Sequence, residues 1–256
     1  MANVVRHADA LRALALLMAG GSGARMRAGG VDRPKPLVEV CGRTLLEWNI
    51  RMLDAAGFRR ITVSVAAGDS ATRAFLDGDA RRILRRDTRL TLIEETAPLG
   101  NIGAIRLVSA DGEPVLVAFA DNLAALDLRS LLAHHRSLGA ALTIAIHEHT
   151  ERLPYGEVQA DGDWITAYVE KPERRTLVSS GFAVAEPDAV SLVPPERPFG
   201  LPDLCRLALE RRLPVAAYAH DAPWIDVNDP PAIAEAAALV ERERAEFERL
   251  LAPQAG

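Results

Sequence analysis

The stretch that decides the fold is residues 14–26, Leu14-Ala15-Leu16-Leu17-Met18-Ala19-Gly20-Gly21-Ser22-Gly23-Ala24-Arg25-Met26. Its first five residues form a short, wholly apolar run, which is typical of a strand buried on both faces. The glycine-rich segment behind it predicts a loop whose backbone N–H groups can bind phosphate. The P-loop motif does not match, because it requires a Gly-Lys pair, and the dinucleotide motif requires a glycine where Met26 stands. Alone, the stretch is equally compatible with an ordinary tight turn.

Further apolar runs of strand length alternate with helical patterns through the first half of the chain. The strands are expected at Ile61–Ala66, Leu90–Ile93, Val115–Ala120 and Leu142–Ile146. Thr44 and Glu47 have the spacing of a capping box, before a helix that Gly57 ends. Asp127 and Gly139 delimit a second helix in the same way. The alternation predicts an α/β fold, a Rossmann-like three-layer sandwich around a mainly parallel, mixed sheet, in a single domain.

After about residue 150 the pattern changes. Asp161-Gly162-Asp163 separates two β-rich runs, Glu157–Ala160 and Trp164–Val169, and predicts a hairpin. Short helices are expected in the proline-rich stretch from Pro187 to Pro202, and one amphipathic helix from Ala232 to Leu251.

Composition excludes several classes of protein. The chain has 256 residues and a formal net charge of −5, which argues against a broad nucleic-acid surface. Two distant cysteines, Cys41 and Cys205, cannot form a disulfide framework or a metal cluster and suit a reducing cytoplasm. The apolar run Leu14–Met18 is too short for a secretory signal, and no run reaches the roughly 20 residues of a membrane span. We expect a soluble cytoplasmic protein that binds neither membrane nor nucleic acid.

The basic residues are unevenly chosen. Of 30, 28 are arginine, and the two lysines, Lys35 and Lys171, each precede a proline. Arg25 and Lys35 follow the glycine loop closely, so they place two cations where a triphosphate would bind. The alternative is a solvated basic loop.

Two acidic residues follow apolar segments. Asp121 comes directly after Val115–Ala120, at the end of a strand where α/β sheets bind ligands, and Asp226 ends a later apolar segment. A pair of carboxylates together with substrate phosphates suits Mg²⁺. The alternatives are a turn carboxylate for Asp121 and a helix cap for Asp226, although Asn228 and Asp229 are better placed to cap.

In its motifs and their order, almost the whole chain resembles the sugar-1-phosphate nucleotidyltransferase family. The matching segments are Gly20–Met26, Pro34–Leu37, Glu95–Ala104, Phe119–Asp121, Tyr155–Val158, Glu170–Pro172, Ser179–Gly181 and Trp224–Val227. The resemblance implies transfer of a nucleoside monophosphate from a nucleoside triphosphate to a sugar 1-phosphate, with release of pyrophosphate.

The resemblance also implies a role for individual residues. The implied nucleotide ligands are Met18, Ala19, Gly20, Gly21, Gly23, Arg25, Lys35, Glu95, Gly100 and Asp121. The implied sugar-phosphate ligands are Gly156, Glu170, Lys171, Ser179 and Ser180. Asp121 and Asp226 would bind Mg²⁺, with Mn²⁺ as an alternative, and the catalytic set would be Arg25, Lys35, Lys171, Asp121 and Asp226. The implied division is an N-terminal extension (1–12), a nucleotide-binding half (13–150), a sugar-phosphate half (151–230) and a C-terminal helix (231–256).

Substrate choice is less constrained. Glu95 occupies the family's base-reading position, where a carboxylate can accept two N–H groups of guanine, and the resemblance extends to mannose- and heptose-1-phosphate guanylyltransferases, so GTP is favoured. Ser179 replaces the family's sugar-contacting Asn, which suggests an unusual acceptor. The alternatives are a uridylyl-, thymidylyl- or cytidylyltransferase acting on a sugar or non-sugar phosphate, and a regulator that binds without turnover. The oligomeric state is open.

Two other clusters are assigned to the surface. His147 and His149 could form a zinc pair, but no third ligand is apparent. The arginines between Arg81 and Arg89 lack the interleaved aromatics of a nucleic-acid patch, so a solvated helix face is expected.

Overall fold

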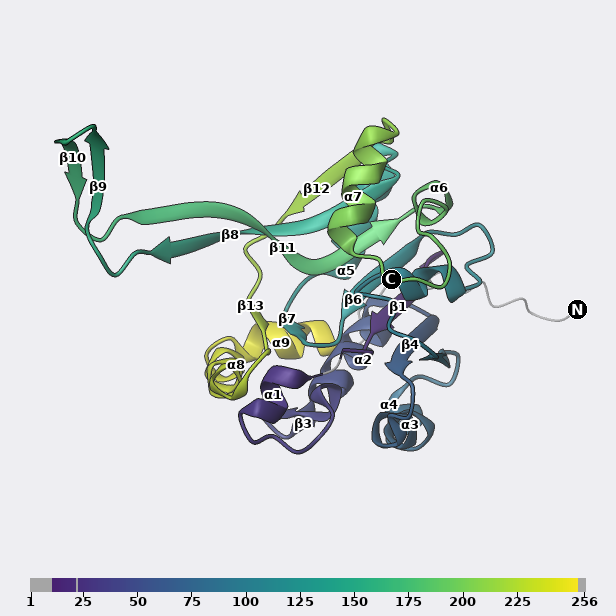
Figure 1. Cartoon of the computed structure of the whole chain (residues 1–256). Coiled ribbons are helices and arrows are strands. Elements are labelled where there is room, and N and C mark those ends of the chain that lie inside the picture. The colour runs from purple at the N-terminus through teal and green to yellow at the C-terminus, as the bar shows by residue number, and fades with distance from the viewer. Residues whose placement is uncertain (1–10, 22, 253–256) are drawn as a thin grey trace, which may run out of the picture.

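A seven-stranded mixed sheet forms the centre of the molecule in the computed structural model, which describes residues 11–21 and 23–252. The strand order is β12-β8-β11-β6-β1-β4-β5 (Figure 1). Strands β6, β1, β4 and β5 are mutually parallel, and β11 runs antiparallel to both β6 and β8. The bounds are β1 Leu14–Met18, β4 Arg60–Ala66, β5 Arg89–Glu95, β6 Val115–Phe119, β8 Leu142–Arg152, β11 Glu173–Ala185 and β12 Val215–Ala219.

Helices and small two-stranded sheets surround this sheet. The helices are α1 Ala24–Ala28, η1 Lys35–Leu37, α2 Leu45–Ala56, α3 Ser70–Asp77, α4 Asp79–Ile83, η2 Gly103–Leu107, α5 Leu128–Leu138, α6 Pro187–Val190, α7 Leu201–Glu210, α8 Pro230–Arg242 and α9 Arg244–Leu251. The remaining strands pair as β2 (Glu39–Val40) with β3 (Arg43–Thr44), β7 (Asn122–Ala124) with β13 (Trp224–Asp226), and β9 (Glu157–Asp161) with β10 (Trp164–Val169).

Both faces of the central strands are buried, as their continuous hydrophobicity predicts. Along β1, Ala15 and Leu17 pack into a core with α2 and α5, while Leu14 and Leu16 pack into a second core with η2 and α7. A third apolar cluster joins α2 to α8 and α9. The α/β sandwich expected from the sequence is therefore confirmed.

The helix ends follow the expected caps. The Thr44 side chain accepts the backbone N–H of Glu47 at 3.0 Å, and Gly57 ends α2 in the left-handed region at φ 104°. Asp127 caps α5, and Gly139 ends it at φ 57°. The Asp161–Asp163 hairpin is also confirmed, with Gly162 at φ 57°.

The expected C-terminal helix is corrected to two helices. Glu243, with φ −105° and ψ 26°, separates α8 from α9. The change of direction lets Phe247 of α9 pack edge-on against Trp48 of α2, with ring centroids 5.7 Å apart. The last four residues, 253–256, lie outside the described part, as do residues 1–10 of the expected N-terminal extension and Ser22 of the glycine loop.

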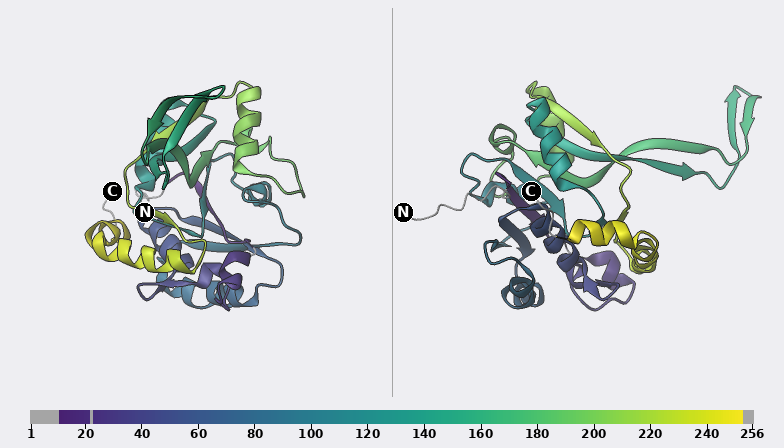
Figure 2. Two further views of the ribbon diagram at one scale, coloured as in Figure 1. Left: turned by 60° about the vertical axis from the view of Figure 1, so that its left-hand side comes forward. Right: turned by 180° about the vertical axis from the view of Figure 1, so that it is seen from behind.

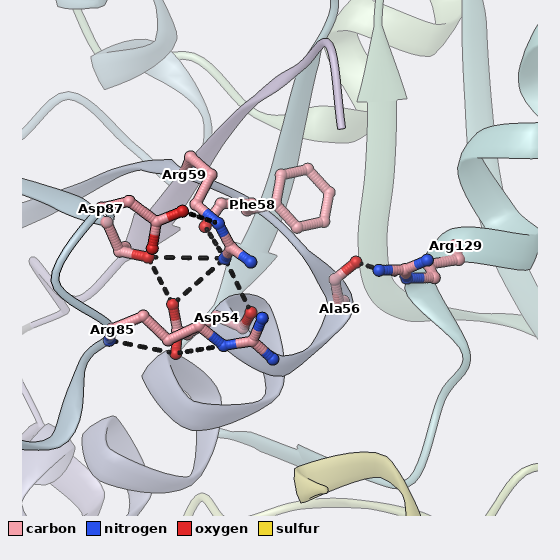
Figure 3. Close-up of polar contacts among 8 residues, drawn as sticks. Asp54, Ala56, Phe58, Arg59, Arg85, Asp87 and Arg129 are labelled. Carbon is pink, nitrogen blue, oxygen red and sulfur yellow. Dashed lines mark hydrogen bonds and ion pairs between the residues drawn. The ribbon is translucent and has the colours of Figure 1, made fainter. Parts of the chain in front are cut away.

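A polar network fixes the chain between α2 and the start of β5 (Figure 3). Asp54, near the end of α2, pairs with Arg59 at 3.3 Å and with Arg85 at 3.7 Å. Arg59 also pairs with Asp87 at 3.0 Å. From α5, Arg129 donates to the carbonyl of Ala56 at 2.7 Å. The arginine cluster near Arg85 is thus partly neutralised by carboxylates.

A long two-stranded ribbon projects from the body of the molecule (Figures 1 and 2). It consists of the outer halves of β8 and β11, whose pairing continues without a shift from Ser179↔Ile146 to Glu173↔Arg152. The small sheet of β9 and β10 lies at its far end. Residues 147–178, called the arm below, include this ribbon and its tip.

Among the described residues, no helix is both long and apolar enough to span a membrane.

Candidate active site

The glycine loop follows β1 at the carboxyl end of the parallel strands, and Gly20 is closely packed there. A Cβ on Gly20 would lie 2.7 Å from Oε1 of Glu95, whereas one on Gly21 would meet nothing within 4 Å. Gly23 has φ 59°, in the left-handed region that glycine adopts at no steric cost. Gly20 and Gly23 therefore have different steric reasons to be glycine, whereas neither space nor backbone conformation requires one at Gly21.

Glu95 is a buried carboxylate at the end of β5. Its Oε1 accepts the hydroxyl of Ser64 at 2.5 Å, and its Oε2 accepts the backbone N–H of Leu99 at 3.1 Å. Each carboxylate oxygen has a second lone pair, so the group can still accept a ligand N–H. The Glu95 carboxylate also lies directly against Gly20, a contact that the sequence did not indicate.

Lys35 lies at the centre of a chain of polar contacts. Its ammonium group donates to Oδ2 of Asp121 at 2.6 Å and to the side-chain oxygen of Asn228. The amide of Asn228 in turn donates to Oδ2 of Asp226. The Lys35 side chain is only 11% exposed, so this is a partly buried ion pair rather than a surface one.

Backbone pairing brings the two aspartates together. Asp121 precedes β7, and β7 pairs with β13 so that Asp226 lies opposite Asn122. The N–H of Val227 also donates to the carbonyl of Asp121 at 2.9 Å. Two residues 105 positions apart thus share one end of the sheet, as expected for a pair that acts together.

Asp226 lies in surroundings that disfavour its ionised form. Burial raises its pKa above the ordinary 3.8, and the neighbouring Asp121 carboxylate raises it further, although Lys35 acts in the opposite direction. Its Oδ1 is buried and has no hydrogen-bond partner among the described residues. An orphaned carboxylate oxygen beside a second carboxylate is the arrangement that a divalent cation would satisfy.

These groups open into a cavity of about 1170 Å³. One side carries the glycine loop and the aspartates. The other is the α7 wall, where the apolar Leu201, Cys205 and Leu209 stand beside the charged Arg206 and Glu210. The predicted site residues that line it are Met18, Gly20, Gly21, Arg25, Glu95, Gly100, Asp121, Ser179 and Asp226. At φ 76°, Gly100 also lies so close to Phe199 that a Cβ would sit 2.5 Å from its carbonyl oxygen.

Other predicted residues lie elsewhere. Ala19 is buried in the core, Gly23 caps α1, and Lys35 lies beside Asp121 without lining the cavity. Gly156 directly precedes β9, and Glu170 and Lys171 directly follow β10, so all three belong to the arm, and none of them lines the cavity.

Ser180 is fully buried where the arm leaves the body. Its hydroxyl contacts Nδ1 of His147 at 2.9 Å and Nε2 of His220 at 2.7 Å, while Trp224 donates to its carbonyl at 2.7 Å. Burial lowers the pKa of both histidines. The assignment of His147 to the surface is therefore wrong, because the side chain is partly buried in this cluster.

Several site residues had no clear signal in the sequence. Asn228 looked like a helix cap, yet Asp229 caps α8, accepting from Ala232 at 3.0 Å, which leaves Asn228 free to bridge Lys35 and Asp226. Ser64 sits inside a buried strand, where a hydroxyl is the one hint of its contact with Glu95. The α7 wall comes from the proline-rich segment, whose path no local pattern predicts.

A glycine loop, a partly buried lysine and two carboxylates thus meet at the carboxyl edge of an α/β sheet, which is where sheets of this class bind ligands. The chain belongs to the nucleotidyl transferase family, whose model matches residues 14–243.

Two curated relatives match the same share of this chain, at low sequence identity. A mannose-1-phosphate guanyltransferase of Eremothecium gossypii is 27% identical over 84% of this chain and 61% of its own length. A mannose-1-phosphate guanylyltransferase catalytic subunit beta of Drosophila pseudoobscura pseudoobscura is 26% identical over 84% of this chain and 59% of its own. The chain thus spans about six-tenths of these relatives.

Among solved structures, HddC from Yersinia pseudotuberculosis complexed with GMP-PN superposes with a TM-score of 0.65 at 22% identity. The match covers 88% of this chain and 97% of HddC. At that identity the likeness concerns the fold.

Proposed function

We propose that the chain transfers a nucleoside monophosphate from a nucleoside triphosphate to a sugar 1-phosphate and releases pyrophosphate. The observation that carries the proposal is the contact chain from Lys35 through Asp121 and Asn228 to Asp226, beside a glycine loop and a cavity large enough for both substrates. Membership of the nucleotidyl transferase family and the names of the curated relatives support the reaction type.

The reaction needs no nucleophile from the protein. The protein contributes by positioning the two substrates and by neutralising the charge of their phosphates. An oxygen of the sugar phosphate attacks the α-phosphorus in line, and the bond to the pyrophosphate oxygen breaks. Arg25 lines the cavity, and Lys35 lies against Asp121, which lines it. We assign these two cations to the triphosphate and the leaving pyrophosphate. Backbone N–H groups of Gly20 and Gly21 add fixed dipoles that need no reorganisation during the reaction.

Asp121 and Asp226 are the residues that would hold Mg²⁺, or Mn²⁺ in its place. The buried, unpartnered Oδ1 of Asp226 and its raised pKa fit a cation ligand. When bound, such an ion supplies charge neutralisation at the triphosphate.

GTP is the proposed donor. Two lines support it: the curated relatives are guanylyltransferases by name, and Glu95 lines the cavity as a carboxylate that can accept two N–H groups of guanine. The acceptor is proposed to contact Ser179 in the cavity and Gly156, Glu170 and Lys171 of the arm. The two cysteines are both free thiols, in keeping with a cytoplasmic enzyme.

Pyrophosphate release tests the proposal directly. The purified protein with Mg²⁺ is offered GTP, ATP, CTP, UTP or dTTP, each against a panel of sugar 1-phosphates and phosphocholine. We expect GTP with a hexose or heptose 1-phosphate to be fastest, and Lys35→Ala to lose activity by orders of magnitude with its fold intact. Faster turnover with UTP or dTTP would refute the donor, and a wild-type rate for Lys35→Ala would refute the site.

A further inference from the structure

The arm carries an unusual amount of exposed apolar surface. Of ten large hydrophobic side chains that are exposed in the described part of the chain, seven lie in residues 153–178. They are Tyr155, Val158, Trp164, Ile165, Tyr168, Val169 and Leu177. Trp164 and Tyr155 are 79% and 77% exposed. Large patches of this kind on a folded surface mark an interaction site.

The architecture of the tip leads to the same conclusion. Strands β9 and β10 form a sheet of two strands, and in the described part of the chain no third strand pairs with it. An isolated two-stranded hairpin is marginally stable in water, and its free edges invite pairing. The tip therefore needs something to pack against.

The arm also gathers one part of the proposed site. A Cβ on Gly156 would lie 2.2 Å from the hydroxyl of Tyr168, so Gly156 is needed for the two segments to pack. The same hydroxyl donates to Glu170 at 3.1 Å. Lys171 follows at φ 47°, a left-handed conformation that is uncommon outside glycine and is often found at functional positions.

The arm cannot bring these residues to its own cavity without breaking its pairing. Glu173 is six residues from Ser179, roughly 20 Å along a continuous ladder. The base of the ribbon is fixed by Ser180, whose contacts with His147, His220 and Trp224 hold β11 at a bulge. Gly181 in this bulge has no room for a Cβ, because the Asn122 amide would lie 1.9 Å away. The direction of the arm is thus determined by buried contacts.

The rim of the cavity also carries exposed apolar surface, which no other described residue covers. Leu209 on α7 is 58% exposed and lines the cavity together with Leu201 and Cys205. The other cations at the cavity are Arg25, next to the glycine loop, and Arg206, which pairs with Glu210 at 2.7 Å. Within the described residues, a free cation for the acceptor phosphate is found on the arm, as Lys171.

We propose that the arm of a second copy of this chain packs on the α7 wall and delivers Gly156, Glu170 and Lys171 to the cavity, so that each active site is shared between two chains. The inference rests on the proposed function for the role of Lys171, and on the exposed apolar surface for the contact itself. Two-fold symmetry lets both arms engage at once, which gives a closed dimer.

A second copy fits the arm better than a lipid surface does. The arm carries seven acidic residues against four basic ones, so anionic membranes would repel it. A second chain offers the arm an apolar surface to pack against, namely the apolar side chains of its α7 wall. Membrane binding remains a measurable outcome of the test.

The association is tested first, without reference to activity. Sedimentation velocity should show a dimer for the wild type and a monomer for Trp164→Asp. The matched control is Leu138→Asp, at a leucine of the body that is also exposed (56%), and it should remain dimeric. A wild type that is monomeric at assay concentration, or a monomer that binds vesicles of phosphatidylcholine and phosphatidylserine through Trp164, would overturn the proposal.

Mixing two inactive variants tests whether the site is shared. Lys171→Ala keeps an intact cavity, and Asp226→Ala keeps an intact arm. After exchange of subunits at 1:1, half of the dimers contain one complete site, so we expect about a quarter of wild-type activity. A mixture no more active than the sum of its parts means that each arm serves its own chain, and it overturns the proposal.

A cross-link separates failure of this inference from failure of the proposed function. In a Cys41→Ser background, Lys171→Cys is treated with a short bis-maleimide that can reach the native Cys205 of the cavity wall. We expect a covalent dimer on a denaturing gel, lost in Lys171→Cys/Cys205→Ser. A covalent dimer from this variant, together with a wild-type chain that transfers no nucleotide, supports the exchange of arms and refutes the enzyme. A cross-linked monomer refutes the exchange alone.

Discussion

At the scale of single residues, the site holds charge that the protein itself does not fully balance. Asp121 has Lys35 as a partner. Asp226 has one oxygen bonded to Asn228 and one that is buried without a partner among residues 11–21 and 23–252. A buried carboxylate in that position costs folding free energy when it is ionised. Such a cost is expected where function requires an anion that the fold alone would not favour.

Asp226→Asn should therefore stabilise the apo protein while abolishing turnover. The folded-state pKa of Asp226 is raised, so its ionised form is penalised at neutral pH, and the penalty disappears as pH falls below the unfolded value near 3.8. Asn keeps an oxygen for Asn228 and carries no charge. Thermal unfolding across pH should show a higher Tm for the variant at pH 7 that converges with the wild type under acid conditions. A lower Tm at pH 7 would contradict this.

Mg²⁺ provides the control for the same pair. Added Mg²⁺ with GTP should raise the Tm of the wild type and not of Asp226→Asn, because a ligand stabilises the state that binds it. Equal shifts in both proteins would mean that Asp226 is not a ligand.

The glycine loop offers a comparison of two adjacent positions. Gly20→Ala pushes a methyl against Glu95, which Ser64 and Leu99 hold in place, so we expect a loss of about 1–3 kcal/mol in the free energy of unfolding. Gly21→Ala meets open space and should unfold like the wild type. Urea titration of both variants measures the difference, and equal midpoints would show that Glu95 moves aside freely.

At the scale of elements, the buried cluster at the base of the arm should respond to acid. Burial lowers the pKa of His147 and His220, so the folded state holds them neutral while the unfolded chain takes up protons below about pH 6.5. The unfolded state then binds more protons, and stability must fall as the pH drops through that range. His135, buried between Thr143 and Glu186, has a pKa lowered by burial as well and adds to the slope.

The double variant His147→Gln/His220→Gln should therefore lose less stability between pH 7 and pH 5 than the wild type. The exposed His149→Gln is the matched control and should keep most of the wild-type slope. Urea midpoints at several pH values measure it. If the urea midpoint of the double variant falls with pH as steeply as that of the wild type, groups other than His147 and His220 cause the acid sensitivity.

Elements with local signals were predictable, and contacts between distant elements were not. The β1 run, the Asp127 and Gly139 caps and the Asp161–Asp163 turn each depend on a few neighbouring residues, and the structure agrees with the sequence there. Lys35 was selected as a lysine close behind the glycine loop, and Asp121 and Asp226 as carboxylates that end apolar segments. The three do meet.

The position of Lys171 follows from longer-range geometry. A β-bulge at Gly181 and the buried hydroxyl of Ser180 set the direction of the arm, and neither has a periodic signature. The role of Asn228 could not be predicted for a similar reason. Its position next to a helix start is typical of a capping residue, and only the tertiary fold places it beside Lys35.

At the scale of the whole molecule, the C-terminal helices connect the two parts of the candidate site. The cluster that contains Trp48 of α2 and Phe247 of α9 also contains Val227, the residue after Asp226. Packing of α8 and α9 on α2 therefore holds the end of β13, which carries Asp226, against the half of the molecule that carries the glycine loop. We therefore expect α8 and α9 to unfold together with the rest of the molecule.

Phe247→Ala tests that coupling. The side chain is 3% exposed and packs edge-on against Trp48 at an interplanar angle of 67°, so its removal should cost about 3–5 kcal/mol. Because the cluster reaches Val227, directly after Asp226, the whole molecule should still unfold in one transition, at a lower urea midpoint and with an unchanged m value. Leu138→Ala, at an exposed leucine, should change stability by less than about 0.5 kcal/mol. Two separate transitions, or a wild-type midpoint, would instead make α8 and α9 an independent unit, and Asp226 would then owe its position to the β7–β13 pairing alone.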